Sequence, residues 1–334
     1  MTDTILPRDA LFDDSDAAPD LPVCDHYCGT ELRMRKALAL QAKLGPVFDI
    51  TFDCEDGAPL GAEAAHAQLC ADFLLSSDNL FGRVGVRVHP VDHPSFSADV
   101  DTLVGRAGDR LAYLMVPKPR HLADLQRAIA QIEHASRVHG RGANLPVHAL
   151  VETHGALRDV FALAALPRIQ SLSFGLMDFV SAHRGAIPQS GMSAKGQFEH
   201  PLVVRAKLEI AAACHAAGKV PSHCVVTEFK DEKAISTAAK RAAREFGYSR
   251  MWSIHPAQIQ PIVDAFSPSV AEVDMAIEII QAAIAARWAP IRHRDTLHDR
   301  ASYRYFWRVI ERARRTGQPL PAEVVAAFFG SSSA

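Results

Sequence analysis

Ionisable side chains follow short apolar runs at six points of this 334-residue chain. Apolar runs of this length are typical of buried strands, and polar groups at their ends are available for binding or catalysis. Any one of these residues is explained by a strand that emerges into water. Six such groups, of both charges, favour one shared site for a metal ion or an anionic substrate. They are Asp-Cys-Glu-Asp-Gly at 53–57, Arg87, Lys118, Glu152, Asp178 and His255.

Glu152 and Asp178 are the candidate metal ligands. Two carboxylates suit a hard cation such as Mg²⁺, which keeps water ligands and accepts further oxygens from a substrate. Zinc would instead recruit histidine or cysteine. Cys24 and Cys28 flank His26 and could bind a softer metal, but the spacing is unusual and buried structural cysteines are the preferred interpretation.

The cations near these acids are candidates for substrate binding. Arg87 can bind a carboxylate through two hydrogen bonds or stabilise an enolate oxygen, and it can equally pair with Glu55 or Asp56. Lys118 lies between two prolines, and nothing in the sequence indicates the lowered pKa that a Schiff-base lysine needs. His255 is either a general base or a structural histidine, and the structural role is favoured.

Eight apolar runs precede or contain these groups, and stretches with helical periodicity separate them. Most runs lack strict alternation, which is typical of parallel strands buried on both faces. The expected strands span residues 21–26, 46–52, 83–88, 111–116, 145–151, 170–174, 220–226 and 251–254. Apolar stripes and helix-ending glycines predict helices at 121–138, 202–217 and 231–246.

This pattern predicts an α/β fold, a (β/α)₈ TIM barrel over residues 21–266, because such a barrel typically takes about 250 residues. A doubly wound sheet is the alternative, but the Gly-rich turn that often follows its first strand is missing. Residues 1–20, with six aspartates, are expected to form a flexible acidic tail. Residues 267–334 are expected to form a helical C-terminal arm with helices at 270–286, 300–315 and 321–329 and no strand.

The composition of the chain disfavours several classes of function and location. Lys and Arg number 36 against 38 Asp and Glu, and this balance disfavours nucleic-acid binding through phosphate contacts. No apolar run reaches the roughly 18 residues of a membrane span, and the first 20 residues lack the pattern of a secretory signal. Six cysteines are too few for a disulfide scaffold, so a reducing cytoplasmic location is expected.

Several motifs, taken in order, resemble the citrate lyase β-subunit/malyl-CoA lyase family of (β/α)₈ enzymes, which is related to the Mg²⁺-dependent oxo-acid aldolases. Each motif is short, and their order and spacing make the match specific. The matching stretches are FDITFDCEDGAP, RVHP, LMVPKP, LVETHGAL, LSFGLMDF and SIHPAQI followed by AFSPS. They spread from about residue 22 to residue 269, most of the chain.

The resemblance implies roles for particular residues. Glu152 and Asp178 match the family's two Mg²⁺ ligands, and Arg87 matches the arginine that contacts the substrate's carbonyl or carboxylate. Glu55 and Asp56 match an acidic pair close to that site. The C-terminal region resembles an arm that reaches over a neighbouring subunit. In this arm, LHDRASY loosely matches a segment with a catalytic aspartate, which makes Asp299 a candidate acid/base.

The expected function is a Mg²⁺-dependent carbon–carbon lyase that cleaves or forms a 3-hydroxyacyl thioester. Arg87, Lys118 and Gly175 are the expected substrate-binding residues, and Arg87, Asp299, Glu55 and Asp56 the expected catalytic ones. The expected partners are a 2-oxo acid, an acyl-CoA and further copies of the chain in a trimer or hexamer. Two alternatives stay open: an aldolase that acts on free 2-oxo acids such as pyruvate, and a non-catalytic binding protein. His89 stands where the family usually has asparagine, which leaves the use of CoA open.

Overall fold

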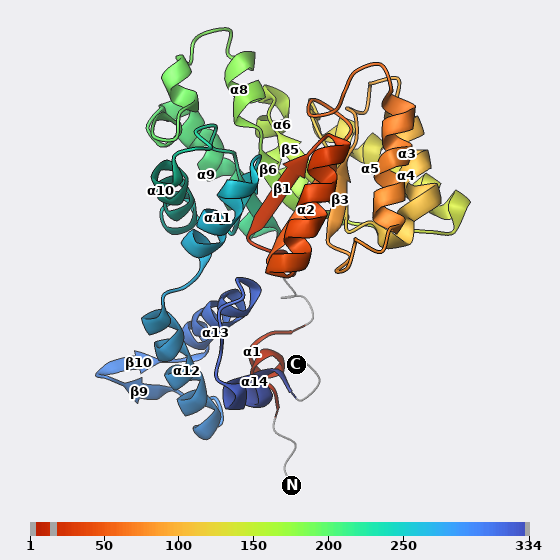
Figure 1. Cartoon of the computed structure of the whole chain (residues 1–334). Coiled ribbons are helices and arrows are strands. Elements are labelled where there is room, and N and C mark those ends of the chain that lie inside the picture. The colour runs from red at the N-terminus through yellow and green to blue at the C-terminus, as the bar shows by residue number, and fades with distance from the viewer. Residues whose placement is uncertain (1–4, 14–18, 331–334) are drawn as a thin grey trace. The chain divides into compact units, whose positions relative to one another are not determined.

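Eight parallel strands close into a barrel in the computed structural model of this chain, which describes residues 5–13 and 19–330. Each strand pairs with the next one along the chain, and β8 pairs with β1 (Figure 1). The closed barrel confirms the predicted fold class and excludes the doubly wound sheet. The strands are β1 Cys24–Cys28, β2 Phe48–Asp53, β3 Val84–Arg87, β4 Leu114–Val116, β5 Val147–Val151, β6 Ile169–Phe174, β7 Val220–His223 and β8 Arg250–Ser253.

Helices alternate with the strands and cover the outside of the barrel (Figure 1). The predicted helix at 121–138 is α5, whose Leu125 and Ile132 are buried and which ends at Gly140 with a left-handed φ of 63°. The barrel helices are α2 Glu31–Leu44, α3 Glu63–Leu75, α4 Phe96–Ala107, α5 Leu122–His139, α6 His154–Arg158, α7 Val160–Ala164, α8 Leu176–Ala182, α9 Pro201–Ala216, α10 Glu232–Arg244 and α11 Ile259–Phe266. Short 3₁₀ turns lie at Gly108–Arg110, Gln189–Met192, Gly196–Phe198 and Pro256–Gln258.

Two layers of side chains fill the inside of the barrel. An apolar layer joins Tyr27, Met115, Leu150 and Trp252, and the rings of Tyr27 and Trp252 stack with centroids 4.4 Å apart. This layer fills the interior beneath the carboxyl ends of the strands, where active sites of such barrels form.

A charged layer lies closer to the amino ends of the strands. Arg250, the first residue of β8, is fully buried and lies 2.6 Å from Asp49 and 3.1 Å from Asp25. Burial raises the pKa of Asp49 to about 6, although the charge of Arg250 acts in the opposite direction. Buried ion pairs of this kind are costly to break, so they favour one arrangement of these strands.

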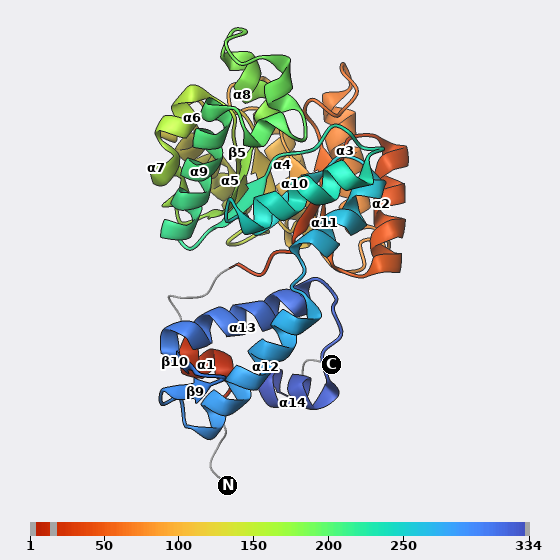
Figure 2. The ribbon, with the colours of Figure 1, turned by 90° about the vertical axis from the view of Figure 1, so that its left-hand side faces the viewer.

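A second unit contains residues 267–330 together with the described residues near the N-terminus. Helices α12 and α13 pack side by side (Figure 2). Ile279, Tyr303 and Trp307 are buried in the apolar core of this unit. The C-terminal boundary of the barrel unit is Phe266. The elements of the second unit are α1 Pro7–Leu11, α12 Val270–Ala285, β9 Ile291–His293, β10 Thr296–His298, α13 Arg300–Arg315 and α14 Ala322–Phe329.

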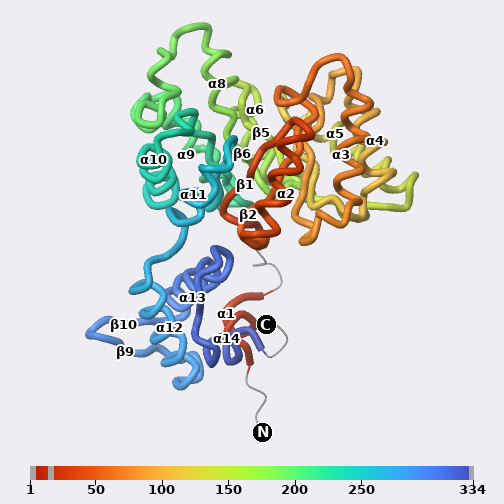
Figure 3. The backbone as a smooth tube through the Cα atoms, viewed as in Figure 1, coloured from red at the N-terminus to blue at the C-terminus, as the bar shows by residue number. Residues whose placement is uncertain are grey.

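The structure differs from the sequence-based expectation at two places in this unit. Within the segment expected to be a flexible acidic tail, α1 packs beside α13 and α14, and its Leu11 is only 1% exposed (Figure 3). The backbone carbonyl of Leu11 accepts a 2.8 Å hydrogen bond from Arg304 Nε. Residues 1–4, 14–18 and 331–334 of the expected tail and arm lie outside the described residues.

The expectation that the arm contains no strand is wrong, because β9 and β10 form an antiparallel hairpin. The two residues of its turn, Arg294 and Asp295, have φ values of 45° and 63°. Tight hairpin turns favour positive φ at both central residues, usually with Asn or Gly. The hairpin was missed because each strand has only three residues and carries little apolar pattern.

Within the described residues, no helix is both long enough and apolar enough to cross a membrane.

Candidate active site

A cavity of about 290 Å³ opens at the carboxyl ends of the barrel strands. Its wall includes Asp53, Arg87, Glu152 and Asp178, which lie at or just beyond the ends of β2, β3, β5 and β6. A second cavity, of about 450 Å³, shares Glu152 and Asp178 and extends past Lys118. The two predicted metal ligands therefore border both cavities.

Two acids hold the guanidinium of Arg87 in place. Its Nε donates to Asp53 Oδ1 at 2.8 Å, and its Nη2 donates to Asp53 Oδ2 at 2.5 Å. Its Nη1 lies 3.0 Å from Glu55 Oε2. Burial alone would lower the pKa of Arg87, but the paired carboxylates raise it above its ordinary value. Because a bidentate pair fixes the plane of the guanidinium, Arg87 presents its remaining N–H groups in a defined direction.

Asp53 organises the loop that follows β2. Its carboxylate accepts hydrogen bonds from the backbone N–H of Glu55 at 2.9 Å and of Gly57 at 2.8 Å. A side chain on Gly57 would bring a Cβ within 2.3 Å of Asp53 Oδ2, so this close approach requires glycine. Among the strand-end residues singled out from the sequence, roles were assigned to Glu55 and Asp56 but not to Asp53. Its position two residues after Thr51 on the inward face of β2 is a signal that could have identified it.

The ammonium group of Lys118 lies among three acids that follow two different strands, β2 and β6. Its Nζ lies 2.5 Å from Glu55 Oε1, 2.8 Å from Asp56 Oδ2 and 3.8 Å from Asp178 Oδ1. Partial burial acts to lower the pKa of Lys118, but the bonded acids raise it above its usual value. A Schiff-base nucleophile needs a neutral amine, so this environment favours a permanent positive charge instead.

Glu152 is a buried carboxylate beside a second acid. It is only 3% exposed, and its Oε1 accepts a 2.7 Å hydrogen bond from the backbone N–H of Lys118. Burial raises the pKa of Glu152 to about 8, and the nearby charge of Asp178 adds to this effect. Asp178, in the first turn of α8, keeps about half of its side chain exposed. A cation between these carboxylates would offset both the burial and the repulsion, so the donor set fits a hard, oxygen-binding metal such as Mg²⁺.

Gly175 makes room for Glu152. A Cβ at this position would lie 2.3 Å from Glu152 Oε2 and 2.5 Å from Glu152 Cβ. Gly175 was predicted to bind substrate. Its small size also has a steric role, because any larger residue would displace the buried carboxylate of Glu152. Gly175 also lines the smaller cavity.

His255 and the motif of Cys24, His26 and Cys28, which were also candidates from the sequence, make other contacts. His255 caps the short turn at Pro256–Gln258, where its side chain accepts from the backbone N–H of Ala257. Among the residues that the structure describes, Cys24, His26 and Cys28 do not bring three ligand atoms together, so the softer-metal alternative for this motif is not supported. His26 Nδ1 instead lies 2.8 Å from Ser253 Oγ.

Asp299 belongs to the second unit, not to the barrel. It is exposed and caps α13, and its Oδ1 accepts from the backbone N–H groups of Ala301 and Ser302. Capping aspartates are common at helix starts, so this contact alone explains the residue type.

The smaller cavity also contains groups that the sequence analysis did not single out. Tyr27 and Trp252 line the smaller cavity as stacked rings, and the guanidinium carbon of Arg87 lies 5.5 Å from the Tyr27 ring centre. Arg33, near the start of α2, is exposed at the edge of the same cavity. These residues come from β1, α2 and β8 and meet only because the barrel closes.

Comparison with known proteins identifies the family. The model of the HpcH/HpaI aldolase/citrate lyase family matches residues 37–256. The L-malyl-CoA/beta-methylmalyl-CoA lyase of Cereibacter sphaeroides is 30% identical over 254 residues, which cover 71% of this chain and 77% of that protein.

Two solved structures extend the comparison. A citrate lyase from Burkholderia xenovorans LB400 is 55% identical, with a TM-score of 0.84, and the match covers 98% of this chain and 99% of that one. The CitE protein of Mycobacterium tuberculosis, in complex with magnesium, acetoacetate and coenzyme A, has a TM-score of 0.64 at 20% identity over 90% of this chain and 99% of that one, a likeness of fold. The chain therefore belongs to the HpcH/HpaI aldolase/citrate lyase family and is a carbon–carbon lyase.

Proposed function

We propose that this lyase uses Mg²⁺ to cleave or form a 3-hydroxyacyl thioester, with a 2-oxo acid as the other substrate or product. The observation that carries the proposal is the buried carboxylate of Glu152, which faces Asp178 beside two fixed cations, Arg87 and Lys118. Burial and the charge of Asp178 both disfavour the ionised form of Glu152, and a bound cation would stabilise that form.

Glu152 and Asp178 are the residues that would hold the metal ion. When bound, Mg²⁺ acts as a Lewis acid that polarises a carbonyl oxygen and offsets the negative charge of carboxylates. Lys118 keeps Glu152 oriented through its backbone N–H, while its ammonium group balances Glu55 and Asp56.

Arg87 would bind the oxygen on which negative charge develops. Three of its N–H groups are engaged by Asp53 and Glu55, and a guanidinium carries five such donors. The remaining donors are available to an enolate or carboxylate oxygen. Because the acids prevent the guanidinium from turning, it needs no reorganisation when charge develops in the transition state.

A thioester substrate is supported by two observations. Relatives named malyl-CoA lyases match most of the chain, and the CitE protein of Mycobacterium tuberculosis was solved with coenzyme A. Arg33 adds an exposed cation at the edge of the smaller cavity, where it can attract an anionic substrate. The six cysteines are free thiols, which fits the reducing cytoplasm expected for CoA chemistry.

We also propose that Asp299 protonates the leaving enolate from a neighbouring subunit of a trimer or hexamer. The proposal is supported by the resemblance of LHDRASY to a segment with this role and by the exposure of Asp299. Mixing Asp299→Asn chains with Glu152→Gln chains tests it. Each variant alone should be inactive, and the mixture should regain activity because some sites combine an intact barrel with an intact arm. A mixture that stays inactive although mixed oligomers form would contradict the proposal.

The principal test measures Mg²⁺ binding and turnover in Glu152→Gln and Asp178→Asn. Each variant should lose Mg²⁺ binding and lower kcat by roughly a thousandfold or more, as should excess EDTA in the wild type. Glu199→Gln is the matched control, because Glu199 is an exposed acid paired with Lys195 at 3.7 Å. Full activity of either site variant would contradict the metal assignment.

A panel of substrates then shows whether the enzyme acts on acyl-CoA thioesters or on free acids. Malyl-type acyl-CoA thioesters should be cleaved far faster than the corresponding free 3-hydroxy acids. Faster turnover of free acids, with pyruvate as the product, would instead establish the aldolase alternative.

A further inference from the structure

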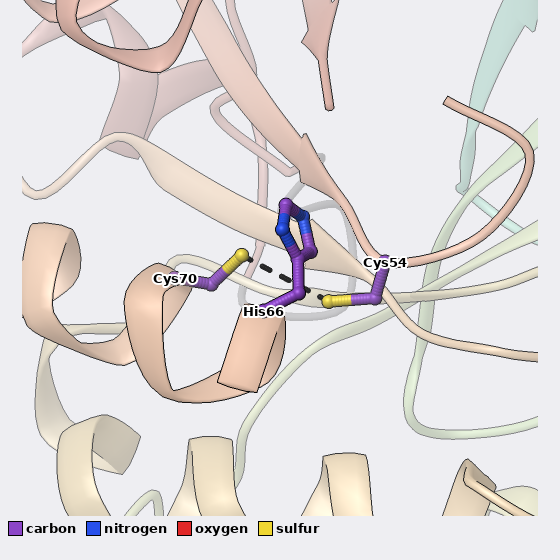
Figure 4. Close-up of side chains that lie close together, drawn as sticks. All are labelled: Cys54, His66 and Cys70. Atoms are coloured by element: carbon purple, nitrogen blue, oxygen red, sulfur yellow. Dashed lines mark hydrogen bonds between the residues drawn. The ribbon is translucent and has the colours of Figure 1, made fainter. Parts of the chain in front are cut away.

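A second group of side chains of the types that bind metals lies close in sequence to the active-site acids but does not line the two cavities. Cys54 directly follows β2, and His66 and Cys70 lie one turn apart on α3. All three are buried, with exposed fractions of 2%, 8% and 0%. Figure 4 shows the two thiols pointing toward each other from the loop and the helix, with the imidazole beside them.

The spacing of these side chains suits a metal ion. The Sγ atoms of Cys54 and Cys70 are 3.8 Å apart, and the three ligand atoms all lie within 4.8 Å of one another. Two sulfurs bound tetrahedrally to zinc at about 2.3 Å each are separated by about 3.8 Å. A disulfide would need them at about 2.05 Å, which is much closer.

The imidazole of His66 is oriented as a ligand should be. Its Nε2 lies 2.9 Å from the backbone carbonyl oxygen of Asp53. A carbonyl oxygen can only accept, so Nε2 carries the proton and the lone pair of the imidazole is on Nδ1. The ring also hydrogen-bonds with the thiol of Cys70, one of the other two proposed ligands. Metal-binding histidines commonly donate their second ring N–H to a carbonyl or carboxylate in this way, which fixes their tautomer and direction.

We propose that Cys54, His66 and Cys70 form a buried site for a thiophilic metal ion such as Zn²⁺ or Cu⁺. Two thiolates and one imidazole are the donors that such ions prefer, in contrast to the carboxylates of the Mg²⁺ site. The two sites do not share a ligand, so this inference is independent of the proposed function.

The bound ion would tie the end of β2 to α3. Cys54 lies between Asp53, which holds Arg87, and Glu55, which contacts both Arg87 and Lys118. His66 bonds the carbonyl of Asp53 itself. Because the donors are buried and lie outside the cavity lining, the role is structural: the ion stiffens the loop that positions the active-site acids.

Metal titration of the full chain tests the site. The reduced, chelator-treated protein is saturated with Mg²⁺ to fill the carboxylate site and is then titrated with Zn²⁺ and, under anaerobic conditions, with Cu⁺. One ion of either kind should bind per chain. Cys54→Ser, Cys70→Ser and His66→Gln should each weaken binding roughly a hundredfold or more. Cys214→Ser is the matched control, since Cys214 is a buried cysteine on α9 outside the cluster, and it should bind like the wild type.

X-ray absorption of the Zn²⁺-loaded wild type gives an answer that does not depend on the folding of variants. A first shell with two sulfurs and a nitrogen, together with a cobalt-loaded form that shows sulfur-to-metal charge-transfer absorption, is the expected result. A first shell of oxygen and nitrogen only would overturn the proposal. So would binding that persists in the Cys54 and Cys70 variants, or a reduced wild-type protein that binds neither Zn²⁺ nor Cu⁺.

Discussion

Glu152 is a deeply buried carboxyl that must be ionised to bind a metal ion. Its protonation is therefore expected to affect metal binding. Burial and the neighbouring charge of Asp178 raise the pKa of Glu152 to about 8. We therefore expect this carboxyl to be protonated at neutral pH without metal, so that a metal ion must displace the proton to bind.

We predict that Mg²⁺ binds more weakly as the pH falls below about 8, by about tenfold for each pH unit. The reason is that only the ionised form of Glu152 is a ligand, and its fraction falls tenfold per unit below its pKa. Calorimetric titration with Mg²⁺ between pH 6 and pH 9 measures this dependence. An affinity that is constant from pH 6 to pH 8 would show that the carboxyl is already ionised without metal.

Asp53 illustrates how one residue supports another at the site. Asp53→Asn should lower the free energy of unfolding by about 3 kcal/mol, because it leaves the buried guanidinium of Arg87 with a weaker partner. It should also lower kcat, since Arg87 is free to turn. Asp72→Asn is the control: it breaks an exposed pair with Arg106 and should cost less than about 1 kcal/mol. Chemical denaturation and steady-state kinetics measure both effects, and equal stability losses in the two variants would refute this account.

At the scale of elements, the junctions between strands and helices set the site. Gly175, between β6 and α8, leaves room for the side chain of Glu152, and Gly57 lets the loop after β2 fold back onto Asp53. Lys118, just beyond β4, has a positive φ of 50°, which is uncommon for a residue with a side chain. These short connections hold charged side chains from separate strand ends close together in defined positions.

Gly175→Ala should disturb the metal site more than the fold. The added Cβ would lie 2.3 Å from Glu152 Oε2, so Glu152 must move, and we expect a large loss of Mg²⁺ affinity with about 1–3 kcal/mol of destabilisation. Gly61→Ala, in an exposed loop, is the comparison. Its Cβ meets no other atom, but its φ of 86° disfavours alanine, so this variant should lose stability while Mg²⁺ binding stays unchanged. Mg²⁺ titration and thermal melts separate the two effects. Normal Mg²⁺ affinity in Gly175→Ala would show that the junction tolerates a side chain.

At the scale of the whole molecule, the barrel unit buries several neutral histidines. Burial lowers the pKa of His26 to about 4 and that of His148 to about 3. The unfolded chain takes up protons on these residues near pH 6.5, whereas the folded protein does not. Each residue therefore contributes stability that is present above pH 6.5 and is lost as the pH falls toward its folded pKa. Asp49 and Glu152, with raised pKa values, act in the opposite direction over part of this range.

Comparison of single variants separates the effect of one histidine on stability from the effects of the other titratable groups. Relative to the wild type, His148→Gln should gain about 1.4 kcal/mol of stability for each pH unit as the pH falls from 6.5 toward 4. His134→Gln, at an exposed position on α5, should show no such trend. Denaturant unfolding at a series of pH values gives the slopes, and parallel slopes for wild type and His148→Gln would contradict a buried neutral imidazole.

The sequence alone determined the barrel and which ionisable residues follow its strands. Hydrophobic periodicity is a local property, so the eight strands and the helices α5, α9 and α10 could be predicted from it. The charged residues at strand ends could be expected to share a rim because parallel strands in a barrel end on the same side. The three-residue strands β9 and β10 were missed, because so short a segment carries too little pattern.

Only the tertiary structure decided which of these residues touch. Asp53 and Arg87 are 34 residues apart in sequence, and Cys54 and Cys70 are 16 apart. Which of them meet depends on strand register and on the packing of α3 against the barrel. Those relations arise from long-range contacts that no local pattern encodes. The protonation of Glu152 likewise follows from burial and from the position of Asp178, which only the folded chain brings together.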